Sequence, residues 1–254
     1  MTALRQEILP SYLDGVPALP ERLWVVGTLP PRLGVAIVGT RRSTSYGETV
    51  ARVLGRAVAT AGWPVISGLA RGIDGVAHQA CVEANETGWA VLGSGLDIVY
   101  PRQNESLAQK LIGQGGGLIS EYEPGTPPAP FRFPARNRII AAFSAAVVVV
   151  EAAVTGGALI TARLALELGR EVLAVPGDIN RTVSEGCNLL IRDGAHPVLG
   201  PDDLVESLTY ILGTPPRSLA SPGTWGEDVD TLLAESEGPV GETLARLTRS
   251  ELGI

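Results

Sequence analysis

Residues 147–176 read VVVVEAAVTGGALITARLALELGREVLAVP and predict a strand, a loop, a helix and a second strand in close succession. The four consecutive valines that begin Val147–Glu151 are typical of a parallel strand covered on both faces. In Ala158–Leu168, leucines recur on one helical stripe, which favours a helix with an apolar face. The apolar run Glu171–Pro176 predicts the return strand. This stretch therefore indicates an α/β fold with parallel strands.

The same alternation is repeated toward the N-terminus. Valine and leucine at helical spacing predict a helix over Tyr46–Ala61. Trp24–Gly27 is expected to add an edge strand. Further buried strands are predicted at Val35–Gly39, Pro64–Gly68, Trp89–Gly93 and Gly117–Glu121. The pattern as a whole predicts an α/β fold of the Rossmann-like type, with a doubly wound, mostly parallel sheet.

The chain divides into three parts by composition. Residues 1–212 contain the strand and helix alternation and are predicted to form one domain. Residues 213–226 are rich in proline, glycine and serine and are predicted to be a linker. Residues 227–254 show two short helical patterns, too little chain to bury a stable core alone. They are interpreted as a short helical C-terminal fragment.

Charge and hydropathy limit the classes of protein to consider. The net charge is −7, but residues 1–200 hold 17 acidic and 17 basic side chains, so residues 201–254 carry the whole deficit. A neutral body can still present a local basic groove. No apolar run approaches the roughly 18 residues of a membrane span, and the N-terminus lacks a signal-peptide layout. We expect a cytoplasmic protein without membrane contact.

The residues that bind metals are scarce. Cys81 and Cys187 are the only cysteines, and His78 and His196 are the only histidines. Two isolated cysteines are more typical of buried apolar positions than of a bridge or a metal site. The sequence therefore predicts neither a metal site nor a cofactor.

Four segments follow predicted strands or precede predicted helices, where open α/β sheets bind ligands. The first predicts a phosphate-binding loop, because glycine, hydroxyl and arginine side chains precede a helix N-terminus. The alternative is a capped helix with solvated arginines. The pattern lacks the G-x-G-x-x-G spacing and the following carboxylate of a dinucleotide site, which excludes NAD. The predicted binding residues here are Gly39, Thr40, Arg41 and Arg42.

The second segment repeats this combination of residues. Asp74 is expected to cap a helix or to pair with Arg71. A catalytic pair of Asp74 with His78 is the sharper alternative, whereas a packed or capping histidine is favoured. The predicted phosphate-binding residues are Ser67, Gly68, Arg71 and Gly72.

The third segment alternates arginine with aromatic residues just before a helix. Rings and guanidinium planes stack on bases while cations follow the backbone, a mixture typical of single-stranded nucleic-acid binding. The alternative is a helix that buries Phe133 and Ile139 and leaves the arginines in water. The predicted contacts are Phe131, Arg132, Phe133, Arg136, Asn137 and Arg138.

The fourth segment is a second glycine loop that opens a helix. Its predicted phosphate-binding residues are Thr155, Gly156, Gly157 and Thr161. Glu151 is the one carboxylate placed for chemistry, yet no nucleophile–base pair and no metal cluster accompanies it. No catalytic residue is therefore predicted.

Taken together, these segments resemble the DprA/Smf family, the DNA-processing proteins of bacterial natural transformation. The resemblance covers roughly residues 20–200 and extends through Gly93–Asp97, Tyr100-Pro101, Val175–Asp178 and Gly186–Ala195. It implies an extended Rossmann fold, single-stranded DNA binding that protects incoming strands, a homodimer, and a role in loading the RecA recombinase. The family's G-S/T-R motif falls on Gly39, Thr40 and Arg41.

The chain departs from the family's pattern at both ends. Many members carry a helical domain before the Rossmann part, where this chain has some 20 residues, and many end in a complete winged helix. Residues 227–254 would supply only part of a winged helix. An apolar patch formed by Leu189–Ile191 and Pro197–Leu208 is a candidate dimer surface, although these residues can equally close the core.

Two other functions remain open at this point. Phosphoribohydrolases of similar fold carry the loop P-G-G-x-G-T-x-x-E, whose carboxylate assists base release. The corresponding stretch, Thr155–Ala162, has no carboxylate, so a binding protein rather than an enzyme is predicted. The second alternative is an interaction module that recognises a small nucleotide signal.

Overall fold

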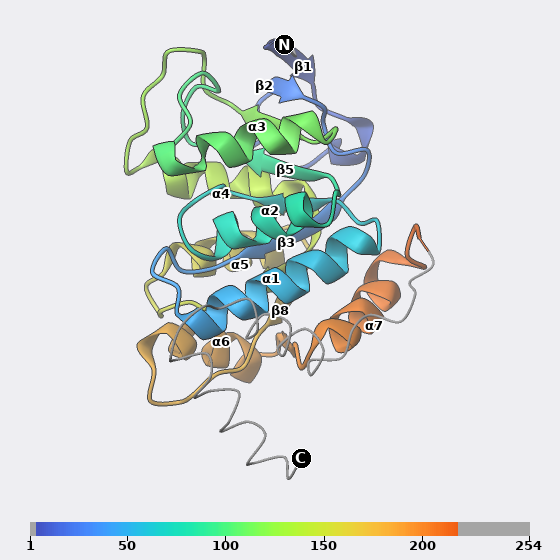
Figure 1. The fold of residues 1–254 in the computed structure, drawn as a ribbon, viewed down its shortest axis with the longest axis vertical. Coiled ribbons are helices and arrows are strands. Elements are labelled where there is room, and N and C mark those ends of the chain that lie inside the picture. Colours follow the sequence, from blue (N-terminus) through green and yellow to red (C-terminus); the bar gives the residue numbers. More distant parts are fainter. Residues whose placement is uncertain (1–3, 218–254) are drawn as a thin grey trace.

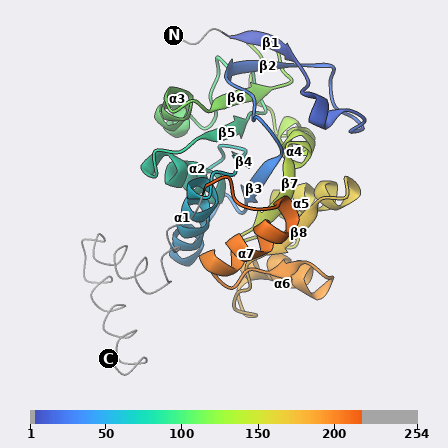
Figure 2. The ribbon, with the colours of Figure 1, turned by 90° about the vertical axis from the view of Figure 1, so that its right-hand side faces the viewer.

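The computed structural model describes residues 4–217, which form a nine-stranded sheet between two layers of helices. The predicted C-terminal fragment, and all of the predicted linker beyond residue 217, lie outside the described residues. The strand order is β1-β2-β6-β5-β4-β3-β7-β8-β9. Figure 1 shows the whole fold, and Figure 2 labels the strands from β1 to β8. The strands are β1 (Arg5–Ile8), β2 (Arg22–Gly27), β3 (Gly34–Val38), β4 (Val65–Ser67), β5 (Gly88–Val91), β6 (Gly117–Ser120), β7 (Ser144–Val149), β8 (Glu171–Ala174) and β9 (His196–Pro197).

The sheet is parallel from β6 to β9, which confirms the predicted doubly wound, mostly parallel arrangement. Strand β2 joins β6 in the antiparallel sense, and β1 pairs with β2 on its outer side. The predicted strand at Trp24–Gly27 is therefore not an edge strand. The edge strand was missed because Arg5–Ile8 is mostly polar and exposed and gives no apolar signal.

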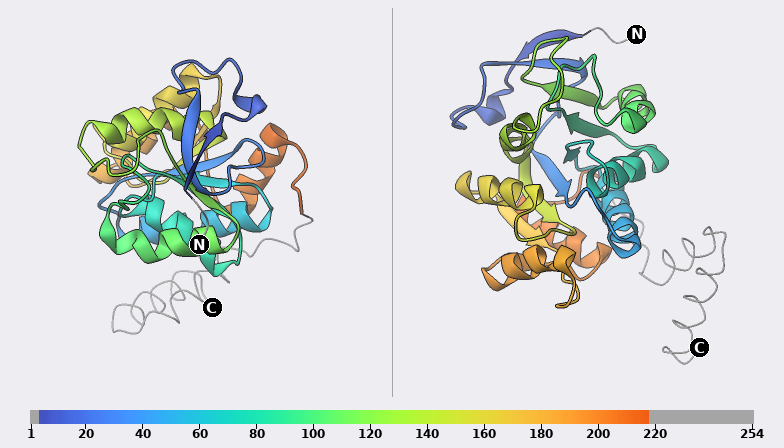
Figure 3. Two further views of the ribbon diagram at one scale, coloured as in Figure 1. Left: turned by 90° about the horizontal axis from the view of Figure 1, so that it is seen from above. Right: turned by 90° about the vertical axis from the view of Figure 1, so that its left-hand side faces the viewer.

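Seven α-helices cover the two faces of the sheet in the described part of the chain. Helices α1, α2 and α3 lie on one face, whereas α4 and α5 lie on the other (Figures 2 and 3). Alternate residues of β3 serve the two faces: Val35 and Ile37 pack with α1 and α2, whereas Ala36 and Val38 pack with α4 and α5. The helices are α1 (Ser45–Thr60), α2 (Ile73–Glu83), α3 (Glu105–Gly113), α4 (Arg132–Ala142), α5 (Gly157–Glu167), α6 (Thr182–Arg192) and α7 (Pro201–Leu212).

Helices α1 and α2 approach each other almost at the level of their backbones. A Cβ atom at Gly55 of α1 would lie 3.1 Å from the carbonyl oxygen of Ala77 and 3.2 Å from the Cβ of Ala80, both in α2. Only a residue without a side chain fits this contact without displacing the partner helix. The pair therefore packs closely, and the loops that lead into both helices arise from neighbouring strands β3 and β4.

The four valines 147–150 are buried in the centre of the sheet, as the sequence predicts. Strand β3 lies between β4 and β7. The chain leaves β3 and β4 toward the face covered by α1 and α2, and it leaves β7 toward the opposite face, which α5 covers. Open α/β sheets bind ligands at such a switch point, beyond the carboxyl ends of the strands. The loops after β3, β4 and β7 all lie at this edge.

The described end of the chain returns to the domain. The amide of Arg217 donates to the carbonyl of Ala61 at 3.3 Å, and its guanidinium pairs with Glu86. The first residues of the predicted linker are thus packed against the α/β domain. Among the described helices, none has the length and apolar character needed to cross a bilayer.

Candidate nucleic-acid interface

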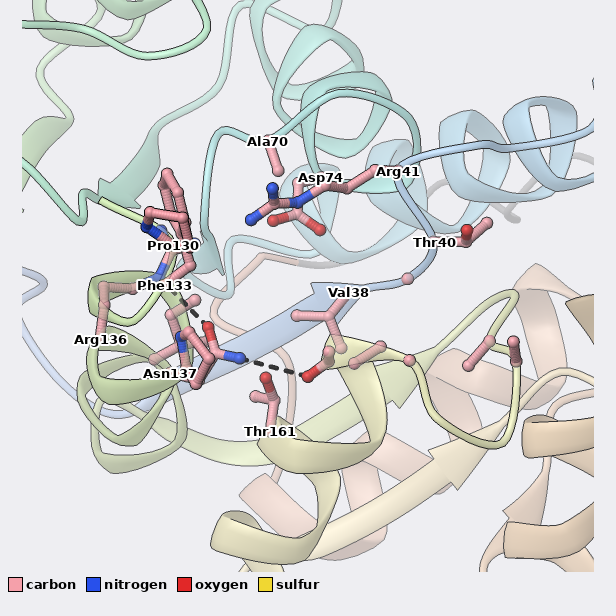
Figure 4. Close-up of a pocket in the computed structure, with 18 of the residues that line it drawn as sticks. Val38, Thr40, Arg41, Ala70, Asp74, Pro130, Phe133, Arg136, Asn137 and Thr161 are labelled. Atoms are coloured by element: carbon pink, nitrogen blue, oxygen red, sulfur yellow. Dashed lines mark hydrogen bonds between the residues drawn. The ribbon is translucent and has the colours of Figure 1, made fainter. Parts of the chain in front are cut away.

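A cavity of about 410 Å³ opens at the carboxyl edge of the sheet, between the loop after β3 and the N-terminus of α5. Figure 4 shows its walls: the loop after β3, the first turn of α5, and the side chains at the start of α4. A smaller cavity of about 180 Å³ adjoins it and shares Arg41, Phe133 and Arg136 in its lining. All four predicted segments line the larger cavity, the second of them through Ala70 and Asp74. The sequence therefore located the edge of the sheet correctly.

Three arginines stand at the mouth of these cavities: Arg41, Arg42 and Arg71, together called the arginine rim. All three side chains are exposed, and within residues 4–217 none of them forms an ion pair. Three cations without counter-charges repel one another, so a bound polyanion would be stabilised there by Coulomb attraction.

An aromatic wall adjoins the rim. The Arg41 guanidinium carbon lies 4.5 Å from the centre of the Phe133 ring, a cation–π contact. The ring of Tyr100 lies 5.7 Å from that of Phe133 and is 46% exposed. The guanidinium and the two rings, which are tilted by 35° to each other, offer aromatic faces of the kind on which nucleobases stack.

A second cluster of an arginine with aromatic rings flanks the cavity. The Arg132 guanidinium carbon lies 5.1 Å from the ring centre of Tyr122 and 5.3 Å from that of Phe131. Phe131 is 70% exposed, and Arg132 also donates to the carbonyl of Pro127. An apolar ring held in water beside a cation is available for base stacking. Tyr100 and Tyr122 were not predicted as contacts from the sequence.

Arg136 occupies the floor of the cavity and does not provide the free charge predicted for it. Its side chain is 3% exposed and donates to the carbonyls of Gly68 (2.8 Å) and Val91. Asp74, 6% exposed, accepts from the Gly68 amide at 3.1 Å. Asp74 therefore neutralises the buried Arg136, not Arg71, which corrects the predicted pairing. A Cβ at Gly68 would lie 2.6 Å from Asp74 Oδ2, so this loop requires glycine.

Burial and charge act in opposite directions on this pair. Burial raises the pKa of Asp74, whereas the nearby Arg136 and the amides of Gly68, Ala70 and Gly39 favour its ionised form. Burial also lowers the pKa of Arg136 to about 10, which Asp74 partly offsets and the proximity of Arg41 reinforces. The loops after β3 and β4 and the end of β5 are thus joined to α4 through the buried pair of Asp74 and Arg136 and its hydrogen-bond partners.

Three other predicted contacts are occupied within the protein. Arg138 pairs with Glu121 at 2.6 Å, so it is not a free cation. The Ser67 hydroxyl is buried and donates to the Ile37 carbonyl at 2.7 Å. Asn137 donates to the Gly157 carbonyl at 3.2 Å and thereby joins α4 to α5. The predicted direct phosphate contacts of Ser67 and Arg138 therefore do not fit their surroundings, because the buried Ser67 hydroxyl already donates within the protein and a carboxylate already neutralises Arg138.

The N-terminus of α1 carries a carboxylate from the protein itself. Glu151 is 3% exposed and accepts from the Thr44 amide at 3.0 Å and from the Thr44 hydroxyl at 2.5 Å. The Thr44 hydroxyl in turn accepts from the Gly47 amide, as an N-cap does. The predicted oxyanion site at this helix end is therefore filled, and Glu151 is a structural residue.

In contrast to the N-terminus of α1, the N-terminus of α5 after the glycine loop that follows β7 is not capped by a side chain. Gly156, Gly157 and Thr161 line the cavity, and Thr155 is exposed beside it. The N-cap residue Gly156 supplies no side-chain hydrogen bond to the first turn of α5. In the second loop, Gly72 has a φ of 72° and forms the N-cap of α2.

The remaining titratable residues near the site have packing roles. His78 is fully buried, its Nε2 lies 3.1 Å from the Trp89 carbonyl oxygen, and burial lowers its pKa to about 4. Its ring therefore packs as favoured from the sequence. Both cysteines are buried and free. Within residues 4–217, no group of three or more histidine, cysteine or acidic residues is arranged to hold a metal ion.

Comparisons with known proteins found a family and several relatives that are similar to this chain. A family model described as DNA recombination-mediator protein A matches residues 1–209. Protein Smf of Escherichia coli strain K12 is 40% identical over 268 residues, which cover 97% of this chain and 72% of the relative. The chain spans between 52% and 72% of the length of the curated relatives it matches.

Two solved structures share the fold at substantial identity. The crystal structure of DprA from Streptococcus pneumoniae superposes with a TM-score of 0.75 at 37% identity, covering 80% of this chain and 74% of that one. The structure of DprA from Helicobacter pylori gives a TM-score of 0.73 at 30% identity, covering 82% and 95%. The latter was described in a study of that protein's single-stranded DNA binding mode.

Proposed function

Because the chain belongs to the DNA recombination-mediator protein A family, which takes part in DNA processing for recombination, we propose that it binds single-stranded DNA at the arginine rim. The observation that carries this proposal is the convergence of Arg41, Arg42 and Arg71 beside the rings of Phe133 and Tyr100. The single-stranded DNA binding described for the H. pylori relative supports it.

Binding at this site reads little of the base sequence. The rim arginines contact phosphates, and the rings accept any base because every base has an aromatic face. Base edges carry sequence information only where side chains hydrogen-bond with them. The protein thus holds strands of any sequence, which suits a general mediator of recombination.

The dependence of affinity on salt tests the proposal. Each phosphate neutralised on a single strand contributes about −0.7 to the slope of log K against log salt. The three rim arginines therefore predict a slope of about −2. Counting every arginine in the four loops would predict a steeper slope, but Arg136 and Arg138 are paired within the protein and do not contribute. Fluorescence anisotropy across a salt series measures it.

The matched comparison is a duplex of the same sequence. Duplex bases are stacked on one another and cannot stack on Phe133, so the single strand should bind more tightly at every salt concentration. Equal affinity for both forms, or a slope near zero, would contradict the proposal.

We also propose that the cavity binds without catalysis. Asp74, which lines the cavity, accepts from Gly68, and Glu151, which precedes the lining residue Ala152, accepts from Thr44. A carboxylate held in this way is poorly placed to move a proton during base release. Incubation with thymidine 5′-monophosphate should therefore release no thymine. Release that grows with protein concentration, and that disappears in Glu151→Gln or Asp74→Asn, would show an enzyme instead.

The wider role follows from the family. We propose that the protein acts in the cytoplasm as a homodimer that protects incoming strands and helps to load the RecA recombinase. Leu190 and Ile191 pack against the core, whereas Leu199 and Tyr210 are 65% and 95% exposed. The exposed residues are therefore the better candidates for a dimer contact than the Leu189–Ile191 run.

A further inference from the structure

Helices α1, α2 and α5 all begin at the carboxyl edge of the sheet, and two of them already carry a carboxylate of the protein. Glu151 accepts from Thr44 at the start of α1, and Asp74 lies in the first turn of α2. Helix α5 begins with Gly157, has no acidic residue in its first turn, and has no side-chain cap. The positive end of its dipole therefore faces the cavity without a counter-charge.

The donors at the start of α5 have no acceptors. Within the described residues, the amides of Gly157 and Ala158 make no hydrogen bond. Thr161 is 2% exposed and lines the cavity, and its hydroxyl makes no hydrogen bond within residues 4–217. Figure 4 shows this hydroxyl directed into the cavity, below the hydrogen bond between Asn137 and Gly157.

The hydroxyl faces the cavity, where a ligand can supply the hydrogen-bond partner that the protein does not. Two amides and one hydroxyl converge here at the positive end of a helix, a set of donors that suits a phosphate group. Asn137 holds the first turn of α5 in place through its bond to the Gly157 carbonyl. The apolar residues Val38, Ile140 and Ala152 also line the cavity and are buried.

We infer that this end of the cavity binds a phosphomonoester: the terminal phosphate of a DNA strand or of a nucleoside monophosphate. A terminal phosphate carries about −1.5 to −2 charges and three free oxygens, whereas an internal phosphodiester must continue on both sides. The aromatic wall of Phe133 lies across the same cavity and can receive the adjoining base. The inference rests on the proposed function, and it adds a preference for strand ends.

Binding of short oligothymidylates of one sequence tests this inference. The strands carry a 5′-phosphate, a 3′-phosphate, or hydroxyls at both ends, and thymidine 5′-monophosphate and thymidine serve as competitors. One phosphorylated end should bind about fivefold more tightly than the hydroxyl strand, a gain typical of a charge at a helix N-terminus. The preferred end gives the polarity of the bound strand. Displacement of the hydroxyl strand by the monophosphate but not by thymidine also supports a phosphomonoester site, with the free nucleotide as its source.

Two substitutions remove single donors. Thr161→Val deletes the hydroxyl, and Gly157→Pro deletes one amide. Proline is compatible at this position, because it is the first helical residue, Gly156 before it is extended (φ −71°, ψ 148°), and a Cβ would meet no atom within 4 Å. Both variants should bring the phosphorylated and hydroxyl strands to similar affinity.

The outcomes separate this inference from the proposed function. Thr209→Val on α7 removes a hydroxyl far along the chain, bonded to Val205, and serves as the matched control. If the wild type binds all strands equally and the monophosphate does not compete, the phosphomonoester site is wrong while single-stranded DNA binding stands. If no strand binds, the proposed function itself fails. A preference that survives both Thr161→Val and Gly157→Pro would also overturn the assignment to α5.

Discussion

Replacing Arg41 with alanine is expected to weaken single-stranded DNA binding about tenfold or more for every sequence tested. Arg41 is exposed at the cavity mouth, has no ion pair within residues 4–217, and stacks on Phe133. A hydrogen bond to a charged group contributes about 1.5–3 kcal/mol, so the loss of one charged phosphate contact is large. The substitution should also bring the salt slope closer to zero by about 0.7, one phosphate contact. Anisotropy titrations at several salt concentrations measure both quantities.

Arg32→Ala provides the matched control for Arg41→Ala. Arg32 is exposed and precedes β3, at the opposite edge of the sheet, where it donates to the Gly62 carbonyl at 3.0 Å. Its removal changes the net charge equally, so it reports the long-range effect of charge alone. If both variants bind DNA alike, the arginine rim is not the binding surface.

Replacing Arg136 with methionine is expected to lower the free energy of unfolding by about 3–5 kcal/mol, because the Asp74 carboxylate is left buried and uncompensated. Both side chains are more than nine-tenths buried, and Arg136 also binds the carbonyls of Gly68 and Val91. Burial raises the pKa of Asp74, and the loss of Arg136 removes the main charge that opposes this rise. Urea unfolding measures the change as a shift of the midpoint.

Two further variants isolate the buried pair. Arg138→Met, two residues along the same helix, breaks the more exposed pair with Glu121 and should cost only about 1 kcal/mol. Asp74→Asn combined with Arg136→Met should be less destabilising than the two single costs added together, because no charge remains unpaired. Additive costs would show that Arg136 stabilises the fold through packing alone.

The fold follows from apolar patterns that are local in the sequence. Val147 and Val149 of β7 are buried, and Leu159 and Leu164 of α5 pack against the same core while remaining partly exposed. The buried side chains of α5 are those of Ala158, Thr161, Ala162 and Ala165. The strand-end loops were likewise found correctly, since a parallel sheet brings the ends of its strands to one edge. Strand β1 was missed because its polar residues bear no such pattern.

The roles of individual arginines could not be obtained in this way. Arg41, Arg136 and Arg138 all stand in loops or helix starts beside glycine or aromatic residues, and their sequence contexts look equally suited to phosphate. Their difference is tertiary: carboxylates from α2 and from the end of β6 reach Arg136 and Arg138 but not Arg41. Pairing across sequence separations of this size depends on the final packing of the helices. The sequence therefore predicts where basic residues gather but not which of them remain unpaired.

The close approach of α1 and α2 at Gly55 fixes the spacing between the two loops that lead into these helices at the binding edge. The two helices meet backbone to backbone at Gly55. The loops that carry Arg41 and Arg71 therefore cannot move relative to each other without separating the two helices at this contact. The distance between the Arg41 and Arg71 guanidinium groups is thus set by Gly55, a residue that does not contact DNA. A larger residue at position 55 would change the spacing of phosphates that the two arginines can contact together. It would therefore alter the affinity for DNA without changing any residue that contacts DNA.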